Sequence, residues 1–409
     1  MTPAAKIPTR PDLVVVPNSS TPADRSIEKR RLRKHSVLNV VRAHGPVSRA
    51  GISKISNFNL PSVSALVDEL VEEGLVLEEE AQRVPRGRRP IPVHLNESAA
   101  SILGIDIGKS STIGLLLNLG GTLITRVEKR TPSLSTPKAH EEWVAKIAAQ
   151  VFAETGDKTP PLAGIGIGLP GLIGKSSSGT ETHNIATHLA TSLEAIYGVC
   201  TIVENDARMM ALGCMLFGQG KALSSFAVLN IGFGLGMGLV LDGRLFQGTQ
   251  GFGGEIGHIP LGESGVPCYC GKSGCLENIV SGSGLVRLAK AKGLAVSDAA
   301  EVAELARKGD RKALAIFRTF SEHLGRTAAV VMNLYDPEAV ILSGRVCRAG
   351  DLFIDGARAE LERHVLAPIA RHSELLVSTL DVDLGPIGAA AAVLHRIFFS
   401  SHVSIDEVI

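Results

Sequence analysis

The pattern of apolar and polar positions divides the chain into a mainly helical head and a longer body that alternates strands with helices. From Arg25 to about Leu95 the sequence reads as helices followed by extended segments, and glycine-rich apolar strands then alternate with amphipathic helices. This alternation is typical of α/β architecture. We therefore predict one domain over 25–95 and a second over 96–409. Residues 1–24 are rich in Pro, Ser and Thr without periodicity, which predicts a flexible tail.

One pattern occurs twice in the body. The segments ILGIDIGKSSTIGLLLNLGGTLI, which starts at Ile102, and FAVLNIGFGLGMGLVLDGRLF, which starts at Phe226, have the same order of features. Each reads as an apolar strand, a glycine-rich turn, a second strand, another turn and a third strand. Two such units, each followed by helices and further strands, predict two similar lobes with a cleft between them. Ligands of α/β proteins usually bind in such clefts.

The head has the pattern of a helix-turn-helix. A basic helix is predicted over 27–43, and a second helix fits SRAGISKIS with Ser48 as its N-cap. A third helix fits PSVSALVDELVEEG and begins with small polar residues, Ser62 and Ser64. Such residues allow a recognition helix to approach base edges and phosphates closely.

A β-wing is predicted after the third helix. The segments LVLEEE and PIPVHLN read as strands, and the loop between them carries three arginines around Gly87, which suits the narrow minor groove of DNA. Three helices can also form a packing module, and an arginine-rich loop can be a solvated turn. The order of helices and wing favours DNA binding. The candidate DNA-contacting residues are Ser48, Asn59, Ser62, Ser64, Arg86, Arg88 and Arg89.

Composition adds three constraints. The net charge of the 409-residue chain is only +1, so a nucleic-acid site has to come from local clusters such as those in the head. The sequence has neither an uninterrupted apolar stretch of membrane-spanning length nor a secretory signal pattern at its start, which predicts a cytoplasmic protein. Three of the six cysteines lie within eight residues, which indicates a metal site rather than a disulfide framework.

The candidate metal ligands follow the spacing H-x9-C-x-C-x4-C, and they are His258, Cys268, Cys270 and Cys275. Four nitrogen and sulfur ligands suit tetrahedral Zn²⁺ and leave no position for water. A closed site of this kind is structural rather than catalytic. The alternative is a group of buried thiols without metal, which three cysteines this close together disfavour.

The segment GGEIGHIPLGESGVPCYCGKSGCLENIVSG resembles the ROK family, which includes repressors and sugar kinases, and the resemblance extends over roughly 25–395. It implies a duplicated, two-lobed sugar-kinase body of the actin-like, ribonuclease H-like class, with a winged helix-turn-helix head as in repressors that respond to xylose or N-acetylglucosamine. The resemblance also implies that the zinc-bound histidine lies close to the sugar.

Candidate sugar contacts come from motifs that match those of the family. Carboxylates and Asn amides can hold sugar hydroxyls in pairs, although each such residue on its own could be a surface charge or a helix cap. The segments VENDARMMALG, GGEIGH and GCLEN supply most of the candidates, and THNIATHL adds one that corresponds less surely. The candidates are Asn184, Asn205, Asp206, Glu255, His258 and Glu277.

The resemblance raises the question of kinase activity, because the residue equivalent to Asp206 is the catalytic base in ROK kinases. Three turns that would hold ATP nevertheless depart from the kinase pattern. The departures are Lys109 in the first turn, Phe233 and Met237 in the second, where both are expected to add bulk, and Ser343 and Arg345 in the third. We therefore expect no catalytic residue, and a sugar pocket without nucleotide.

The sequence thus predicts a sugar-responsive transcriptional regulator, most simply a repressor, that binds operator DNA as a homodimer or a dimer of dimers. Two other functions stay open. One is an active ATP-dependent sugar kinase with an accessory DNA-binding head. The other is a zinc-stabilised sugar-binding module whose head binds another protein.

Overall fold

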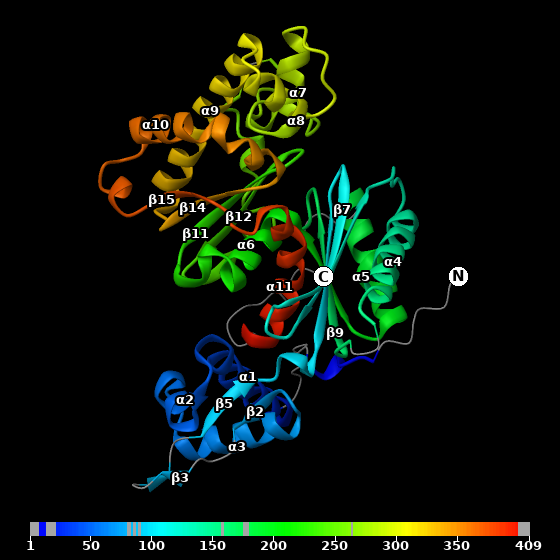
Figure 1. Cartoon of the computed structure of the whole chain (residues 1–409), viewed down its shortest axis with the longest axis vertical. Coiled ribbons are helices and arrows are strands. Elements are labelled where there is room, and N and C mark those ends of the chain that lie inside the picture. The colour runs from blue at the N-terminus through cyan, green and yellow to red at the C-terminus, as the bar shows by residue number, and fades with distance from the viewer. Residues whose placement is uncertain are drawn as a thin grey trace.

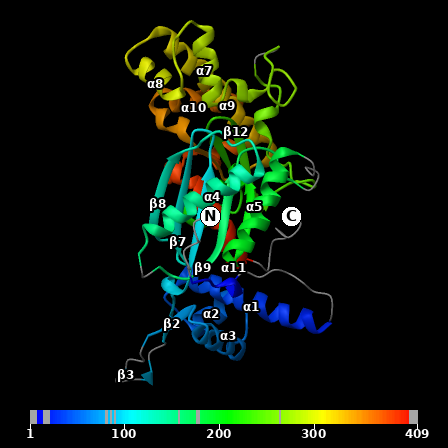
Figure 2. The same cartoon turned by 90° about the vertical axis from the view of Figure 1, so that its right-hand side faces the viewer.

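The computed structural model describes residues 8–13, 22–79, 83–84, 87–88, 91–156, 159–174, 180–262 and 265–399. These parts form a head and two lobes that follow one another along the long axis of the molecule (Figures 1 and 2). The head lies at one end, the first lobe occupies the middle, and the second lobe lies at the other end.

The head is a winged helix-turn-helix. Its helices are α1 (Pro22–His44), α2 (Arg49–Ser56) and α3 (Leu60–Glu72). Its antiparallel sheet has the order β1-β5-β2 and consists of β1 (Val47–Ser48), β5 (Pro92–Leu95) and β2 (Val76–Glu78). The short hairpin of β3 (Arg83–Val84) and β4 (Gly87–Arg88) extends between β2 and β5. The predicted order of three helices and a two-stranded wing is confirmed.

Ion pairs neutralise the acidic face of α3. Two basic residues of α1, Arg30 and Lys34, pair with Glu69 and Glu73, and Arg49 of α2 contacts Asp68 at 2.7 Å. Three acidic side chains of the run VDELVEEG are therefore paired within the head. The start of α3 contains no acidic residue.

Residues 8–13 are ordered, so the prediction of a flexible tail over 1–24 is wrong for this segment. Thr9 pairs with Leu162 in a parallel bridge, and the N–H of Arg10 donates to the carbonyl of Leu162 at 2.7 Å. Leu13, in the 3-10 helix η1 (Pro11–Leu13), is buried. The guanidinium of Arg10 also donates to the carbonyl of Glu73 at 3.2 Å, so this segment joins the first lobe to the head.

The two lobes share one sheet topology. The first sheet has the order β8-β7-β6-β9-β10, from β6 (Ser101–Ile107), β7 (Ser111–Asn118), β8 (Leu123–Arg130), β9 (Leu162–Leu169) and β10 (Cys200–Asn205). The second has the order β13-β12-β11-β14-β15, from β11 (Phe226–Ile231), β12 (Leu235–Leu241), β13 (Arg244–Phe246), β14 (Ala339–Ser343) and β15 (Glu374–Val377).

In each sheet the first three strands are antiparallel and the last two are parallel to the first. The predicted duplication is therefore confirmed. Asp106 near the end of β6 and Asn230 near the end of β11 hold equivalent positions in the two copies, within GIDIG and VLNIG.

Helices cover both sheets. In the first lobe α4 (Pro137–Ala153) and α5 (Glu181–Tyr197) lie on one face, and α11 (Leu384–Phe399) lies on the other (Figure 1). The second lobe carries α7 (Gly282–Ala291), α8 (Ala299–Arg307), α9 (Arg311–Tyr335) and α10 (Ile354–His364). Helix α6 (Asp206–Phe217) packs on α11 and on strands of both sheets. The 3-10 helices used below are η4 (Ile256–His258), η5 (Leu276–Asn278), η6 (Arg345–Leu352) and η8 (Asp381–Asp383).

Helix α11 lies directly against the first sheet because glycines leave room for its backbone. A Cβ atom at Gly104 would lie 2.1 Å from the carbonyl oxygen of Pro386, and one at Gly166 would lie 1.8 Å from that of Ala389. Any larger residue at either strand position would push the helix away from the sheet.

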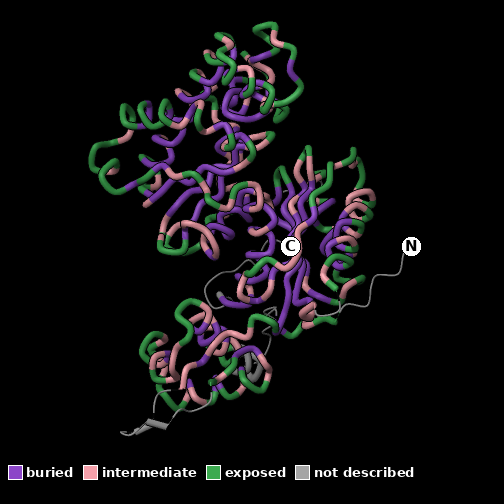
Figure 3. Tube along the Cα trace, in the orientation of Figure 1, coloured by how far each residue is buried: buried purple, intermediate pink, exposed green. Residues whose placement is uncertain are grey.

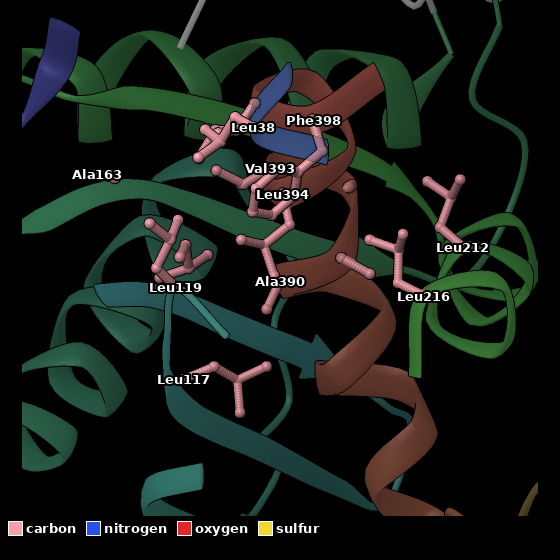
Figure 4. Packing of buried hydrophobic residues seen from close by; sticks show 14 of the residues in the cluster. Leu38, Leu117, Leu119, Ala163, Leu212, Leu216, Ala390, Val393, Leu394 and Phe398 are labelled. Carbon is pink, nitrogen blue, oxygen red and sulfur yellow. The ribbon is translucent and has the colours of Figure 1, made fainter. Parts of the chain in front are cut away.

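Buried residues occur in the head and in both lobes (Figure 3), and one hydrophobic cluster continues from the first lobe into the head. Leu38 of α1 lies beside Phe398 and Leu394 at the end of α11, and all three are almost completely buried (Figure 4). Arg42 of α1 also lies over the ring of Phe398, 5.2 Å from its centroid. The head and the body are therefore joined by packing as well as by the chain.

Candidate metal centre and ligand-binding site

The ends of three neighbouring strands bring Asp106 and Asp206 together. In the first sheet β9 lies between β6 and β10, so Asp106 and Glu204 both lie opposite Gly168, and Asp206 follows β10 directly. A Cβ atom at Gly168 would lie 3.1 Å from Oδ1 of Asp106 and 3.6 Å from the Cα atom of Asp206. The glycine therefore gives both carboxyl groups space at the same sheet edge.

Asp206 connects the two lobes through hydrogen bonds. Its Oδ1 accepts the N–H of Ala207 at 2.9 Å, and its Oδ2 accepts the side-chain amide of Asn230 from the second lobe at 3.0 Å. Burial raises the pKa of Asp206 to about 6. Burial, followed by the charge of Asp206, raises the pKa of Asp106 to about 7. At neutral pH Asp206 is thus mainly ionised and Asp106 partly protonated.

The predicted sugar-binding asparagines lie in different surroundings. Asn205 is at the end of β10, where its Oδ1 accepts the N–H of Arg208 at 3.2 Å and its Nδ2 donates to the carbonyl of Gly171 at 3.1 Å. Asn184 is exposed in the first turn of α5. Among the described residues, no hydrogen bond joins its side chain to the other candidates.

The second lobe contributes two more acidic residues. Burial raises the pKa of Glu255 to about 7; the charge of Arg208 opposes this rise, whereas the charges of Asp206 and Glu277 add to it. Glu277 is buried, and its Oε2 accepts the N–H of Leu235 at 2.9 Å. A Cβ atom at Gly234 would lie 2.4 Å from this oxygen, so Glu277 fixes the glycine-rich turn before β12. Asp206, Glu255 and Glu277 therefore interact electrostatically.

The four predicted metal ligands lie together. One ring nitrogen of His258 and the three cysteine Sγ atoms all lie within 4.8 Å of one another. The distance from Nδ1 of His258 to Sγ of Cys268 is 3.7 Å, and Sγ of Cys270 lies 3.6 Å from Sγ of Cys275. Ligands at Zn–S and Zn–N bond lengths in a tetrahedron are about 3.6 Å apart, so these residues fit a four-coordinate ion.

Tyr269, between two of the cysteines, belongs to this site and was missed in the sequence analysis. Its hydroxyl lies 3.2 Å from Nε2 of His258, and the two rings meet edge to face at 5.2 Å. Burial, followed by the charge of Glu277, raises the pKa of the Tyr269 hydroxyl. The side chain as a whole is nevertheless 79 % exposed. An aromatic residue between two metal ligands was the only signal in the sequence.

Two of the altered turns meet. The ammonium group of Lys109, after β6, lies 5.5 Å from the ring centroid of Phe233, after β11. Phe233 is 60 % exposed. Met237, in contrast, lies within β12 and is buried in the core of the second lobe. The expectation that Met237 adds bulk to the turn is therefore wrong, because the alternation of β12 directs its side chain into the core.

Arg345, in the third altered turn, bridges the lobes. Its guanidinium donates to the hydroxyl of Ser111 and to Oε1 of Glu128, the latter at 2.6 Å. Beside it, Arg126 of β8 contacts Glu128 at 2.9 Å and Asp383 of η8, directly before α11, at 2.7 Å. The lobes are thus tied together on the side of the altered turns.

In the head, two of the predicted DNA contacts act as helix caps. The hydroxyl of Ser48 accepts the N–H of Gly51, and Oδ1 of Asn59 accepts the N–H of Ser62. Asn59 is exposed, whereas Ser62 and Ser64 are partly buried at the start of α3. Arg86 and Arg89 lie outside the described residues, and only the backbone of Arg88, in β4, is described.

Similar proteins include both regulators and kinases. The xylose repressor of Bacillus subtilis is 28 % identical over 377 residues, which cover 91 % of this chain and 97 % of the repressor. A solved ROK family transcriptional regulator, a homolog of the E. coli MLC protein, has a TM-score of 0.78 at 24 % identity and covers 90 % of this chain and 97 % of its own. A ROK family glucokinase from Streptomyces griseus, solved with glucose and AMPPNP, has a TM-score of 0.61 at 26 % identity and covers 71 % of this chain and 98 % of its own.

These likenesses confirm the predicted fold class, a winged helix-turn-helix head with a duplicated sugar-kinase body. Within the described part of the chain, no helix combines the length and the apolar character needed to cross a membrane. The sequence profile of the ROK family matches residues 102–396, which include both lobes and the metal ligands. The chain therefore belongs to the ROK family.

Proposed function

We propose that the chain is a sugar-responsive transcriptional repressor that acts in the cytoplasm. In this proposal the head, residues 25–95, binds operator DNA, and the body, residues 96–409, binds the sugar. The similarity to a xylose repressor over almost the whole chain supports both roles. DNA contacts are assigned to Ser48, Asn59, Ser62, Ser64, Arg86, Arg88 and Arg89, and two heads in a homodimer or dimer of dimers read the two halves of an operator.

One observation carries this proposal, namely that α11 contacts both the acidic site and the head. Near its start, a Cβ atom at Gly385 would lie 2.5 Å from Oδ2 of Asp106. Near its end, Phe398 packs beside Leu38 of α1. The 16 residues of the helix span about 24 Å. A sugar that changes the lobe arrangement around Asp106 therefore has a rigid, packed route to the DNA-binding head.

The sugar site is assigned to the acidic residues between the lobes and to the metal loop. Hydrogen bonds from the sugar hydroxyls are accepted by the carboxyl groups of Asp206, Glu255 and Glu277. The proposed set is completed by Asn184, Asn205 and His258. His258 can serve both functions because its two ring nitrogens have different neighbours: Nδ1 lies 3.7 Å from Sγ of Cys268, and Nε2 lies 3.2 Å from the hydroxyl of Tyr269. The ion is assigned as Zn²⁺, since three thiolates and one imidazole form a closed structural zinc site. Zinc would hold the GGEIGH segment in position.

The alternative of an active kinase has one specific observation in its favour. Asp206 is retained, and its raised pKa of about 6 would suit a general base. Against it, Lys109 and Phe233 occupy the first and second phosphate turns, and Arg345 in the third is paired with Glu128. In our proposal Asp206 therefore accepts a hydrogen bond from the sugar and abstracts no proton.

Two measurements test the function. Fluorescence anisotropy with DNA from upstream of the chain's own gene should show binding that weakens with salt and that changes with xylose, N-acetylglucosamine or glucose. A coupled ATPase assay with the same sugars should show no turnover. Turnover that is lost in Asp206→Asn would establish the kinase instead, and absence of DNA binding at any salt concentration would favour a head that binds protein.

A further inference from the structure

Arg208, in the first turn of α6, is a buried cation. Its side chain is only 2 % exposed. Nη1 donates to the carbonyl of Gly251 at 2.6 Å, while Nη2 donates to the carbonyl of Ile173 and to Oε1 of Glu204. The sequence shows only an arginine within an apolar helix, VENDARMMALG, and gives no indication of these partners.

The partners of Arg208 come from different parts of the molecule. Glu204 lies on β10, Ile173 lies in the loop after β9 of the first lobe, and Gly251 lies in the loop after β13 of the second lobe. The two loops also touch directly, since a Cβ atom at Gly174 would lie 2.4 Å from the carbonyl oxygen of Gln250. One guanidinium therefore joins a loop of each lobe.

Charge neutralisation alone does not account for this arrangement. The desolvation of a buried cation is offset by Glu204 at 2.6 Å, and a lysine could also provide that pair. The two carbonyls on opposite loops, in contrast, are bonded by two different nitrogens, Nη1 and Nη2, and the single Nζ of a lysine cannot take both positions. The specific consequence of having arginine at 208 is thus the connection between the loops.

Both loops adjoin the proposed sugar contacts. Asn205 holds Gly171 in the first loop, and Glu255 follows Gly251 by four residues. Asp206 lies two residues before Arg208 on the same helix turn. We propose that Arg208 is a positioning residue of the sugar site. Its guanidinium holds the two loops together, so that both loops are in position before the sugar binds. This inference rests on the proposed sugar-sensing function, and it adds the residue that couples the two lobes at the site.

The test compares Arg208→Lys with wild type in the full-length protein. Lysine keeps the charge pair with Glu204 but cannot bond both carbonyls. Hydrogen-deuterium exchange without sugar should become faster in both loops, 170–174 and 247–255. Isothermal titration with xylose, N-acetylglucosamine and glucose should show binding of the wild-type ligand weakened about 10-fold or more, the value expected for charged hydrogen bonds. Zinc content should stay unchanged, because Arg208 contacts none of the four metal ligands.

The matched control is Arg326→Lys. Arg326 pairs with the buried Glu360 in the second lobe and is distant from Arg208 in the sequence. Arg326→Lys should therefore leave the exchange of both loops and the sugar affinity unchanged. If Arg208→Lys does not fold, the double variant Arg208→Met/Glu204→Met removes the buried pair together and takes its place.

Each result has one meaning. Unchanged loop exchange would overturn the connection between the loops, and faster exchange with unaltered sugar affinity would overturn the positioning role. If the wild-type protein binds none of the three sugars, the proposed sugar-sensing function is contradicted. The exchange experiment still decides whether Arg208 joins the loops.

Discussion

Replacing Asp106 by Asn should stabilise the protein far more at pH 8 than at pH 5. The folded protein raises the pKa of Asp106 from 3.8 to about 7, through burial and the nearby charge of Asp206. Between these two values the folded state therefore holds more protons than the unfolded state, so stability falls as the pH rises through this window. Asparagine carries no charge and removes this dependence.

The size of the effect follows from the two pKa values. Compared with a group that stays neutral, the carboxyl group of Asp106 lowers the free energy of unfolding by about 1.5 kcal/mol at pH 5 and by about 4 kcal/mol at pH 8. Asp106→Asn should thus gain about 2 to 3 kcal/mol more at pH 8 than at pH 5. The repulsion between Asp106 and Asp206 is already included in this difference, because it is one cause of the raised pKa of Asp106.

Urea unfolding followed by circular dichroism at the two pH values would measure this difference. Asp351→Asn is the control, because Asp351 lies at the surface and its pKa is lowered by Arg307. Its effect should be the same at pH 5 and pH 8, since it is ionised at both. If Asp106→Asn also had equal effects at the two pH values, the idea of a buried, partly protonated acid would be refuted.

Three further predictions concern other parts of the molecule. Cys275→Ser removes one of four ligands, so zinc measured by atomic absorption should fall well below one ion per chain, whereas Cys347→Ser, outside the cluster, should retain it. Leu38→Ala leaves a cavity where α1 meets α11 and should lower the free energy of unfolding by about 2 to 5 kcal/mol in a urea titration; an unchanged midpoint would contradict a shared core. Glu128→Gln breaks the pairs with Arg126 and with Arg345, both partly exposed, and should cost about 1 kcal/mol or less, mostly abolished in 1 M salt; a larger, salt-independent loss would argue against screened ion pairs.

Local sequence patterns predicted the elements of this fold and the metal ligands. The duplicated strands and the three helices of the head are visible because their periodicity and caps are encoded within short segments, as with Ser48 before α2. The cysteine cluster is equally local, since the three thiols lie within one loop. The ordered segment 8–13 was missed because its partner, Leu162, lies on a strand more than a hundred residues away.

The candidate site was predicted less completely, because its contacts depend on the folded loops. The predicted asparagine contacts were based on matching motifs, but the amide of Asn205 is bonded to Gly171 and to the start of α6. Met237 was assigned to a turn, although its place in the alternation of β12 puts it in the core. Tyr269 and Arg208 could not be recognised, since their partners come together only when distant segments fold.

The equivalence of Asp106 and Asn230 has a consequence for how the halves of the body close. The amide of Asn230 offers an N–H to Asp206, which an ionised carboxylate at the same place could not do. Had both copies of the repeat retained an acid, three anions would converge at one point, and closure would require an added cation or further protonation. An amide in one copy and a carboxyl group in the other therefore let the two equivalent strand ends meet at Asp206 as unlike partners.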